Sequence, residues 1–204
     1  MVTDDSFFAP YTEGFFALHH DEDHARAYRE IARTIFAEFN PQSVIDVGCG
    51  TGNLLSEIQY WDHSVDIRGI EAPQSQARIR NAGMRIAPEF YDWVDLRSIG
   101  QLEYRRYDLA ISVEVAEHLP EESAEGYVKF LCSLSDTVLF SAARPGQGGT
   151  GHINEQPIEW WSALFAENGF ALDPTATRRI QFKLTGNVGR CTWYERLFVF
   201  RRLP

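Results

Sequence analysis

The sequence predicts an α/β fold in which helices cover both faces of a doubly wound, mainly parallel sheet of seven strands. Short apolar runs alternate with segments of helical periodicity along most of the chain, and this alternation is typical of parallel sheets. The last two strand candidates have only a loop between them, so we expect an antiparallel hairpin at one edge. A single domain, residues 1–204, accounts for the chain length.

The order of elements follows from apolar periodicity and from the residues that end each run. Asn40-Pro41 ends the first long helix, and Gly83 stands where a left-handed residue would end the third. The predicted helices are 23–39, 53–61, 74–83, a segment after Pro120 with Tyr127, Val128 and Leu131 inward, and 155–169. The predicted strands are 43–47, 66–72, 93–96, 107–115, 137–143, 179–184 and 194–201.

Composition and charge exclude several classes of protein. Apolar residues make up 44% of the chain, as in ordinary globular domains, and no apolar run approaches the ~20 residues that span a bilayer. The N-terminus lacks the basic and apolar regions of a secretory signal, and three widely spaced cysteines fit a reducing cytosol. A cytoplasmic protein without a membrane partner is expected.

The net charge of −10 argues against general binding of nucleic acid, which depends on phosphate neutralisation. The charge is unevenly distributed, because seven of the 19 Lys and Arg residues fall in 175–204, where Glu195 is the only acidic residue. This basic segment is interpreted as the solvated face of two strands, with contact to an anionic substrate as the alternative.

The stretch "VIDVGCGTGNLL" places Gly48, Gly50 and Gly52 at the end of a buried strand and before a helix. Glycines there allow a sharp turn and the close approach of a ligand to bare backbone. A dinucleotide fingerprint would need glycine where Asn53 stands, and Asp46 would repel a pyrophosphate but attract a cation. A nicotinamide-dependent oxidoreductase is therefore the weaker alternative.

These residues resemble motif I of the class I S-adenosylmethionine-dependent methyltransferases, and the resemblance extends over residues 40–200. It implies a Rossmann-like fold and S-adenosylmethionine as cofactor. Glu71, at the end of the second strand, matches the residue that binds the ribose hydroxyls. Asp95 in "WVDL" matches the one that faces the adenine amino group, although Asp92 is a nearby rival. The segment "YDLAISVEVAEHLP" resembles the fourth motif, which places Glu114 beside the cofactor.

The segment "EVAEHLP" also carries candidates for chemistry. Glu114, Glu117 and His118 follow the fourth strand, and His152 follows a glycine-rich loop after the fifth, so all four could meet at one edge of the sheet. This arrangement is similar to metal-dependent O-methyltransferases of ubiquinone biosynthesis and of small-RNA 3′ ends, which implies a divalent metal such as Mg²⁺ on these four residues. Metal-free catalysis by Glu117, His118 or His152 as base or substrate-positioning group, and a structural role, remain open.

Two further segments are predicted to border the site. The loop 144–151, with four glycines in eight residues, and the polar residues after it are interpreted as a substrate-facing lid. The aromatic-rich segment 1–22 is expected to cap the pocket and exclude water. The histidines of "LHHDEDH" are taken as a polar loop and helix start rather than a metal tract.

The sequence thus predicts a methyltransferase that acts on a small polar metabolite, at a hydroxyl group. The alternatives are a metal-dependent RNA 2′-O-methyltransferase, the nicotinamide-dependent oxidoreductase and a S-adenosylmethionine-binding accessory protein without activity. The sequence does not specify the acceptor or the oligomeric state.

Overall fold

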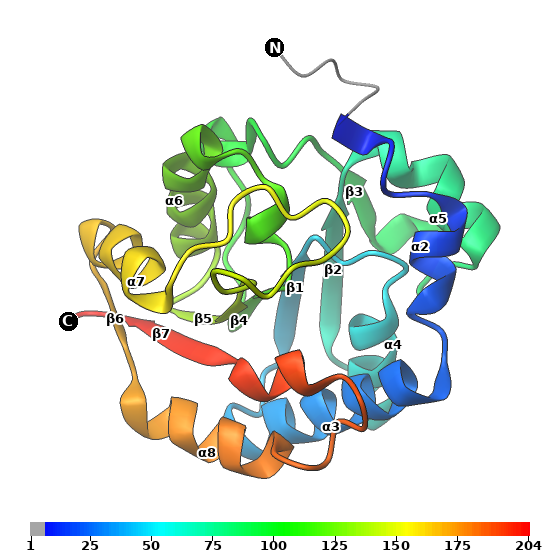
Figure 1. The fold of residues 1–204 in the computed structure, drawn as a ribbon. Helices are drawn as coiled ribbons and strands as arrows, with labels where there is room; N and C mark the ends of the chain where they lie inside the picture. The colour runs from blue at the N-terminus through cyan, green and yellow to red at the C-terminus, as the bar shows by residue number, and fades with distance from the viewer. Residues whose placement is uncertain (1–6) are drawn as a thin grey trace.

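The computed structural model describes residues 7–204, and within them seven strands form one sheet in the order β3-β2-β1-β4-β5-β7-β6 (Figure 1). The strands are β1 Ser43–Val47, β2 Asp66–Glu71, β3 Tyr91–Trp93, β4 Leu109–Val113, β5 Thr137–Ser141, β6 Phe170–Leu172 and β7 Phe198–Arg202. All neighbouring strands from β3 to β5 are parallel, whereas β7 is antiparallel to both β5 and β6. The predicted fold class, with an antiparallel C-terminal edge, is confirmed.

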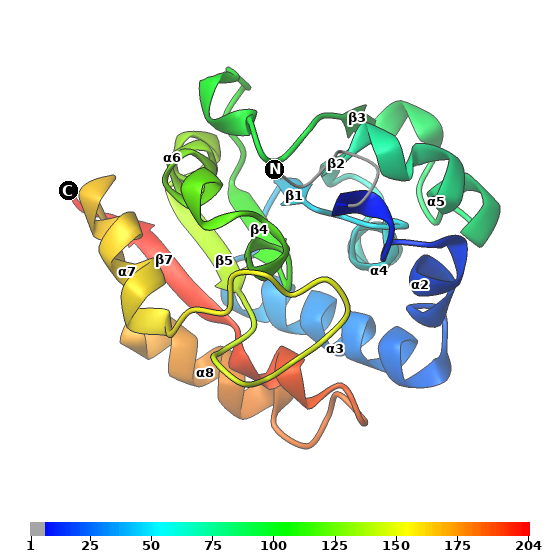
Figure 2. The same ribbon diagram turned by 45° about the horizontal axis from the view of Figure 1, so that its top comes forward.

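Helices cover both faces of the sheet (Figures 1 and 2). The helices are α2 Glu13–Leu18, α3 Glu22–Glu38, α4 Asn53–Trp61, α5 Gln76–Ala82, α6 Ala124–Leu134, α7 Ile158–Glu167 and α8 Pro174–Leu184. Helices α3, α4 and α8 pack on one face, and α6 and α7 pack on the other. A third apolar cluster joins the N-terminal aromatic residues to α5.

The pleat of each strand divides its side chains between the two cores. In β5, Leu139 belongs to the core beneath α3, α4 and α8, whereas Val138 and Phe140 belong to the core beneath α6 and α7. All of β5 is buried, as expected for a parallel strand covered on both faces. This arrangement explains why the central strands read as continuous apolar runs.

The predicted strand 179–184 is wrong, because this segment is the second half of α8. The Asp173 carboxylate accepts hydrogen bonds from the backbone N–H groups of Thr175 and Ala176, and Pro174 occupies the first helical position. Ile180 and Leu184 are buried at helical spacing, while Phe182, which gave the segment its alternating pattern, is 84% exposed. The strand that pairs with β7 is instead β6, and a helix rather than a loop connects the two.

Other predicted boundaries shift by a few residues. The third strand, β3, spans Tyr91–Trp93 and shares only Trp93 with the predicted range 93–96, so Asp95 lies after the strand. The last strand begins at Phe198 because residues 192–196 form a 3₁₀ turn. The glycine at the end of α5 is confirmed, since Gly83 has a φ of 106°. The basic segment 175–204 accordingly spans a helix, a loop and one strand instead of two strands.

Candidate active site

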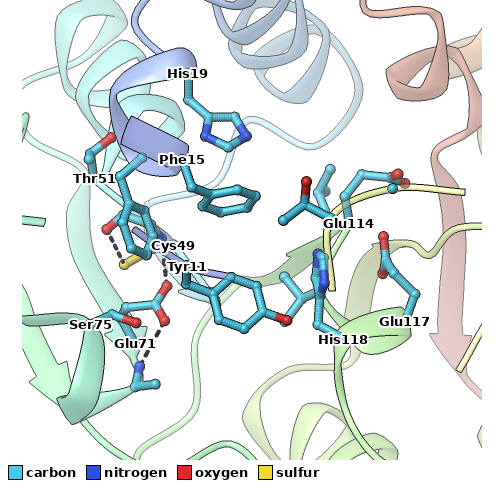
Figure 3. Close-up of a pocket in the computed structure, with 18 of the residues that line it drawn as sticks. Tyr11, Phe15, His19, Cys49, Thr51, Glu71, Ser75, Glu114, Glu117 and His118 are labelled. Carbon is cyan, nitrogen blue, oxygen red and sulfur yellow. Dashed lines mark hydrogen bonds between the residues drawn. The ribbon is translucent and has the colours of Figure 1, made fainter. Parts of the chain in front are cut away.

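A pocket of about 560 Å³ lies at the carboxyl ends of the central strands (Figure 3). The glycine-rich turn, the ends of β2 and β4, the N-terminal aromatic residues and the loop after β5 all contribute to its wall. Ligands of open α/β sheets bind at this end of the strands. Every residue that the sequence predicted for cofactor binding or catalysis lines this pocket except Gly52, which lies behind its wall.

The glycine-rich turn requires glycine for two different reasons. Gly48, Gly50 and Gly52 all have left-handed backbone conformations, with φ values of 85°, 54° and 82°. A Cβ atom at Gly48 would lie 2.5 Å from Cγ2 of Val115, and one at Gly52 would lie 2.9 Å from the Tyr91 hydroxyl oxygen. At Gly50 the space is open, so the turn leaves bare backbone facing the pocket there.

Two buried carboxylates face the pocket next to this turn. Glu71 accepts hydrogen bonds from the backbone N–H groups of Gly50 at 2.9 Å and of Ala72 at 2.8 Å, which fixes its side chain against the glycine-rich turn. Burial raises the pKa of Asp46 to about 7, and the charge of Glu71 adds to this shift. Because a bound cation would relieve the desolvation of both groups, this part of the pocket favours a positively charged ligand.

Asp95 lines the pocket, but its carboxylate is bound by a neighbouring arginine. Nε of Arg97 donates to both Asp95 oxygens, at 2.9 and 3.1 Å, and this ion pair lowers the pKa of Asp95. The guanidinium group of Arg97 lies 4.8 Å from the ring centre of Phe7. Asp95 therefore sits where the N-terminal segment meets the pocket. Its rival Asp92, on β3, instead pairs with Arg68 of the neighbouring strand β2.

Glu114 follows β4 with a strained backbone. Its φ of 55° is unusual for a residue with a side chain, and such conformations concentrate at functional sites. The Ser141 hydroxyl donates to one Glu114 oxygen at 2.7 Å, and Nε2 of Gln147 donates to the other at 3.1 Å. The Glu114 carboxylate is thus bound to β5 and to the glycine-rich loop.

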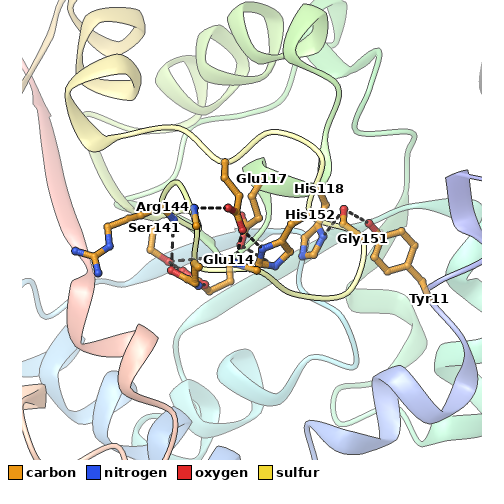
Figure 4. A network of polar contacts seen from close by, with 12 residues as sticks. Tyr11, Glu114, Glu117, His118, Ser141, Arg144, Gly151 and His152 are labelled. Atoms are coloured by element: carbon orange, nitrogen blue, oxygen red, sulfur yellow. Dashed lines mark hydrogen bonds and ion pairs between the residues drawn. The ribbon is translucent and has the colours of Figure 1, made fainter.

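Glu117, His118 and His152 gather on the pocket wall (Figure 4). One ligand atom of each lies within 4.8 Å of the other two, and Nε2 of His152 is 3.9 Å from Oε1 of Glu117. Glu117 is fully buried, and neither carboxylate oxygen accepts a hydrogen bond of normal geometry from residues 7–204. Burial, reinforced by Glu114, raises its pKa well above the ordinary range, while burial lowers the pKa of His118 to about 4.

This cluster fits a divalent cation. A buried carboxylate beside two imidazoles offers the ligand types that borderline and hard divalent ions accept. Of the four predicted metal ligands the structure brings these three together, whereas the Glu114 carboxylate is directed to Ser141 and Gln147 instead. The arrangement can bind a cation, or it can orient and deprotonate a hydroxyl group directly.

Glu155 organises the loop after β5, a role that sequence reasoning did not assign to it. Its carboxylate accepts hydrogen bonds from the backbone N–H groups of Gly146 at 2.8 Å and Gly148 at 2.7 Å, and from Nδ1 of His152 at 2.9 Å. The backbone N–H groups of Ile153 and Asn154 also donate to the Glu117 carbonyl oxygen. The sequence feature that could have indicated this contact is the spacing of His152 and Glu155, which are three residues apart.

Tyr11 connects the N-terminal segment to the same cluster (Figure 3). Its hydroxyl donates to the Gly151 carbonyl oxygen at 3.4 Å, and its ring lies 5.5 Å from that of His118. Nη1 of Arg78 donates to the carbonyl oxygens of Phe8 and Tyr11, which attaches the segment to α5. The predicted cap therefore borders the pocket through residues 7–19, and residues 1–6 lie outside the described residues.

The remaining candidates have structural surroundings. His19 and His24 line the pocket, but within the described residues the only metal-like group is that of Glu117, His118 and His152. Nδ1 of His24 is paired with Asp21 at the start of α3, in agreement with a polar helix start. Cys49 is a small buried residue, and burial raises the pKa of its thiol.

The sequence matches a family model described as "Methyltransferase domain" over residues 18–171. Among curated proteins it is similar to a ubiquinone biosynthesis O-methyltransferase of Neisseria meningitidis. The identity is 26% over 91 residues, which cover 43% of this chain and 38% of that protein. The match thus spans well under half the length of this relative.

Solved structures share the fold. A sugar N-methyltransferase from Streptoalloteichus superposes with a TM-score of 0.66 at 16% identity, covering 94% of this chain and 92% of that one. Magnesium protoporphyrin IX methyltransferase from Synechocystis, solved with bound S-adenosylhomocysteine, gives a TM-score of 0.62 at 19% identity, with coverages of 89% and 84%. The methyltransferase domain of a bacterial Hen1 gives 0.59 at 19%, with coverages of 90% and 100%.

Proposed function

The chain belongs to the class I S-adenosylmethionine-dependent methyltransferases, and we propose that it methylates a hydroxyl group of a small polar metabolite. The observation that carries the proposal is the cluster of Glu117, His118 and His152 in the wall of the pocket that also contains the glycine-rich turn. Transfer to an oxygen profits from a group that takes up the hydroxyl proton, and this cluster lies where such a group is needed.

The cofactor side of the pocket is assigned to residues at the carboxyl ends of β1, β2, β3 and β4. We place the ribose hydroxyls at Glu71, the adenine near Asp95, and the positively charged part of the cofactor near Asp46 and Glu114. The turn of Gly48, Gly50 and Gly52 supports this assignment because it brings bare backbone to the pocket wall. Asp46 supports it because a buried carboxylate is stabilised by a cation.

S-adenosylmethionine supplies an activated methyl group, whose C–S bond breaks with its electron pair left on sulfur as the new C–O bond forms. The protein positions the acceptor oxygen for this displacement and receives its proton. Without a metal, Glu117 suits the second task, because burial raises the affinity of its carboxylate for a proton. His118, whose pKa is lowered by burial, is neutral near pH 7 and can accept a hydrogen bond or bind a metal through a ring nitrogen.

A divalent cation is part of the proposal. Glu117, His118 and His152 would hold it, and when bound it would lower the pKa of the acceptor hydroxyl. Glu114 is not assigned as a ligand, since its oxygens are engaged by Ser141 and Gln147. Methylation of RNA is disfavoured by the net charge of −10, which opposes binding of a polyanion.

The test is methyl transfer from isotopically labelled S-adenosylmethionine to fractionated acceptors, with RNA, protein and small-molecule fractions assayed separately. We expect the label in the small-molecule fraction. Mass spectrometry of the labelled product should show that its new methyl group is bound to oxygen. Glu71→Gln should abolish transfer together with binding of S-adenosylhomocysteine in calorimetry, and the exposed Glu125→Gln serves as the matched control. Label only in RNA, or on nitrogen or carbon, would overturn the proposal.

A further inference from the structure

A second cavity lies beside the active-site pocket, on the other side of the loop after β5. It measures about 410 Å³ and is lined by Arg144, Pro145, Gly146, Gln147 and Arg196. The first four belong to the loop, and Arg196 belongs to the 3₁₀ turn Thr192–Arg196, which comes some fifty residues later in the chain. Two arginines from distant segments thus meet around one hollow of an acidic protein.

No hydrogen bond or ion pair reaches the side chain of Arg144 or Arg196 from residues 7–204, and the charge of Arg196 acts only through space on the Glu114 carboxylate. Other arginines of the same C-terminal region are paired, as Arg201 is with Asp173 and Arg179 with Glu38. Figure 4 shows the Arg144 side chain directed away from Glu117 and His152, toward the C-terminal ribbon.

The carboxylates next to this cavity already have partners of their own. Glu155 accepts from the backbone N–H groups of Gly146 and Gly148 and from His152, and Glu195 accepts from the backbone N–H of Gly186. Two guanidinium groups around one cavity repel each other unless an anion lies between them. Their planar sets of N–H donors match the two oxygens of a carboxylate or phosphate.

This cavity is connected to the reaction site through shared residues. Gln147 lines both cavities, and its amide donates to Glu114 at 3.1 Å. Trp193 and Tyr194, in the same 3₁₀ turn as Arg196, line the active-site pocket. An acceptor with its hydroxyl near Glu117 can therefore extend along Gln147 to the two arginines.

We propose that Arg144 and Arg196 bind an anionic group, a carboxylate or a phosphate monoester, of the methyl acceptor. The inference rests on the proposed function and narrows its substrate class to hydroxylated small molecules that carry a negative charge. The two arginines act as positioning residues, because they hold the far end of the acceptor and leave the reacting oxygen to Glu117 and its neighbours. In a protein with a net charge of −10, such a pair selects for one charged group without attracting a polyanion.

Anion binding is tested first, without turnover. Protein labelled with ¹⁵N-arginine is titrated with inorganic phosphate and, separately, with acetate, and the Nε–Hε signals of Arg144 and Arg196 are assigned through Arg144→Gln and Arg196→Gln. Both signals should shift with one saturable midpoint, and Arg178, an exposed arginine of α8, should not shift. Absence of a shift, or the same shift for all three arginines, would overturn the site whether or not the protein transfers methyl groups.

The second arm asks whether the acceptor carries the anion. Labelled S-adenosylmethionine is incubated with a small-molecule metabolite extract, and the labelled product is applied to an anion exchanger. Retention of the labelled product on the exchanger supports the proposal. If treatment with alkaline phosphatase abolishes this retention, the anionic group is a phosphate monoester, and if retention persists, the group is a carboxylate. A neutral or cationic labelled product, or a labelled RNA, contradicts it. Failure of all transfer would instead count against the proposed function, since the titration stands apart from it.

Variants of the two arginines show whether these residues position the methyl acceptor. Each of Arg144→Gln and Arg196→Gln should raise the acceptor concentration needed for half-maximal labelling about tenfold, as loss of one charge-assisted pair does, with the maximal rate nearly unchanged. Lysine at either position should restore part of the loss, because the charge remains and the paired donors do not. Arg178→Gln should match the unmodified protein. Equal behaviour of all the variants would overturn the assignment.

Discussion

The Glu155 carboxylate accepts a hydrogen bond from Nδ1 of His152 at 2.9 Å, which leaves the opposite ring nitrogen, Nε2, 3.9 Å from the buried carboxylate of Glu117. An acidic partner on one imidazole nitrogen fixes the proton there and leaves the other nitrogen as a lone-pair donor. The same carboxylate binds two backbone N–H groups of the glycine-rich loop. Loop conformation and the tautomer of His152 are therefore linked through one side chain.

Replacement of Glu155 should slow methyl transfer, although we do not place this side chain in contact with the reacting atoms. We expect Glu155→Ala to lower kcat/KM by about 10- to 100-fold, the range found for residues that orient a ligand histidine. Glu155→Gln should lose less, because an amide oxygen still accepts the same bonds. A second measurement, independent of activity, is the ¹⁵N spectrum of the His152 ring. In Glu155→Ala this spectrum should show a mixture of the two tautomers, because no carboxylate holds the proton on Nδ1. Glu159→Ala, an exposed glutamate in α7, is the control, and an unchanged His152 spectrum would contradict this role.

Substitution at the first glycine of the turn should cost folding stability. Gly48→Ala combines a φ of 85° with a Cβ atom 2.5 Å from Val115, so the free energy of unfolding should fall by about 3 kcal/mol. Gly146→Ala, which has a φ of 80° but open space, should cost only about 1 kcal/mol. Urea denaturation measures both. If Val115→Ala does not recover part of the loss in Gly48→Ala, the steric explanation fails.

Metal removal should reveal the cluster of Glu117, His118 and His152. After exhaustive EDTA treatment we expect methyl transfer to fall at least tenfold and to return with added Mg²⁺ or Mn²⁺. The melting temperature of the metal-free protein should rise on addition of the metal alone, because a ligand that binds the folded state stabilises it. Glu117→Gln should remove this rise, and Glu121→Gln should keep it. Full activity in EDTA would exclude metal dependence and leave direct proton transfer to Glu117 or His118.

Acidification should destabilise the protein through His19. Burial lowers the pKa of His19 in the folded state from its ordinary value of 6.5 to about 4, and nearby His24 adds to the shift. Between these pH values the unfolded chain binds a proton that the folded chain does not, so stability falls as pH decreases from about 6.5 to 4 and is constant above that range with respect to this group. The melting temperature of His19→Gln should depend less steeply on pH, whereas that of His63→Gln should change with pH as in the unmodified protein. Parallel curves for His19→Gln and the unmodified protein would show that its burial has no such effect.

Apolar periodicity was sufficient to predict the central strands of the sheet and most of the helices, because each central strand is buried on both faces and each helix on one. It failed at Arg179–Leu184, where Ile180, Phe182 and Leu184 alternate as in a strand. The Asp173 cap and Pro174 at the start of α8 outweighed that alternation, and packing of Ile180 against the core decided the face. Local pattern and local start signals conflicted there, and the sequence alone did not rank them.

The sequence by itself identified the glycine-rich turn, since Gly48, Gly50 and Gly52 all adopt the left-handed backbone conformation that glycine permits. It also placed His118 and His152 after neighbouring strands. Only the tertiary structure decided how those side chains are used. The direction of Glu114 toward Ser141, the capture of His152 by Glu155, and the meeting of Arg144 with Arg196 depend on contacts between segments distant along the chain, and no local periodicity encodes such contacts.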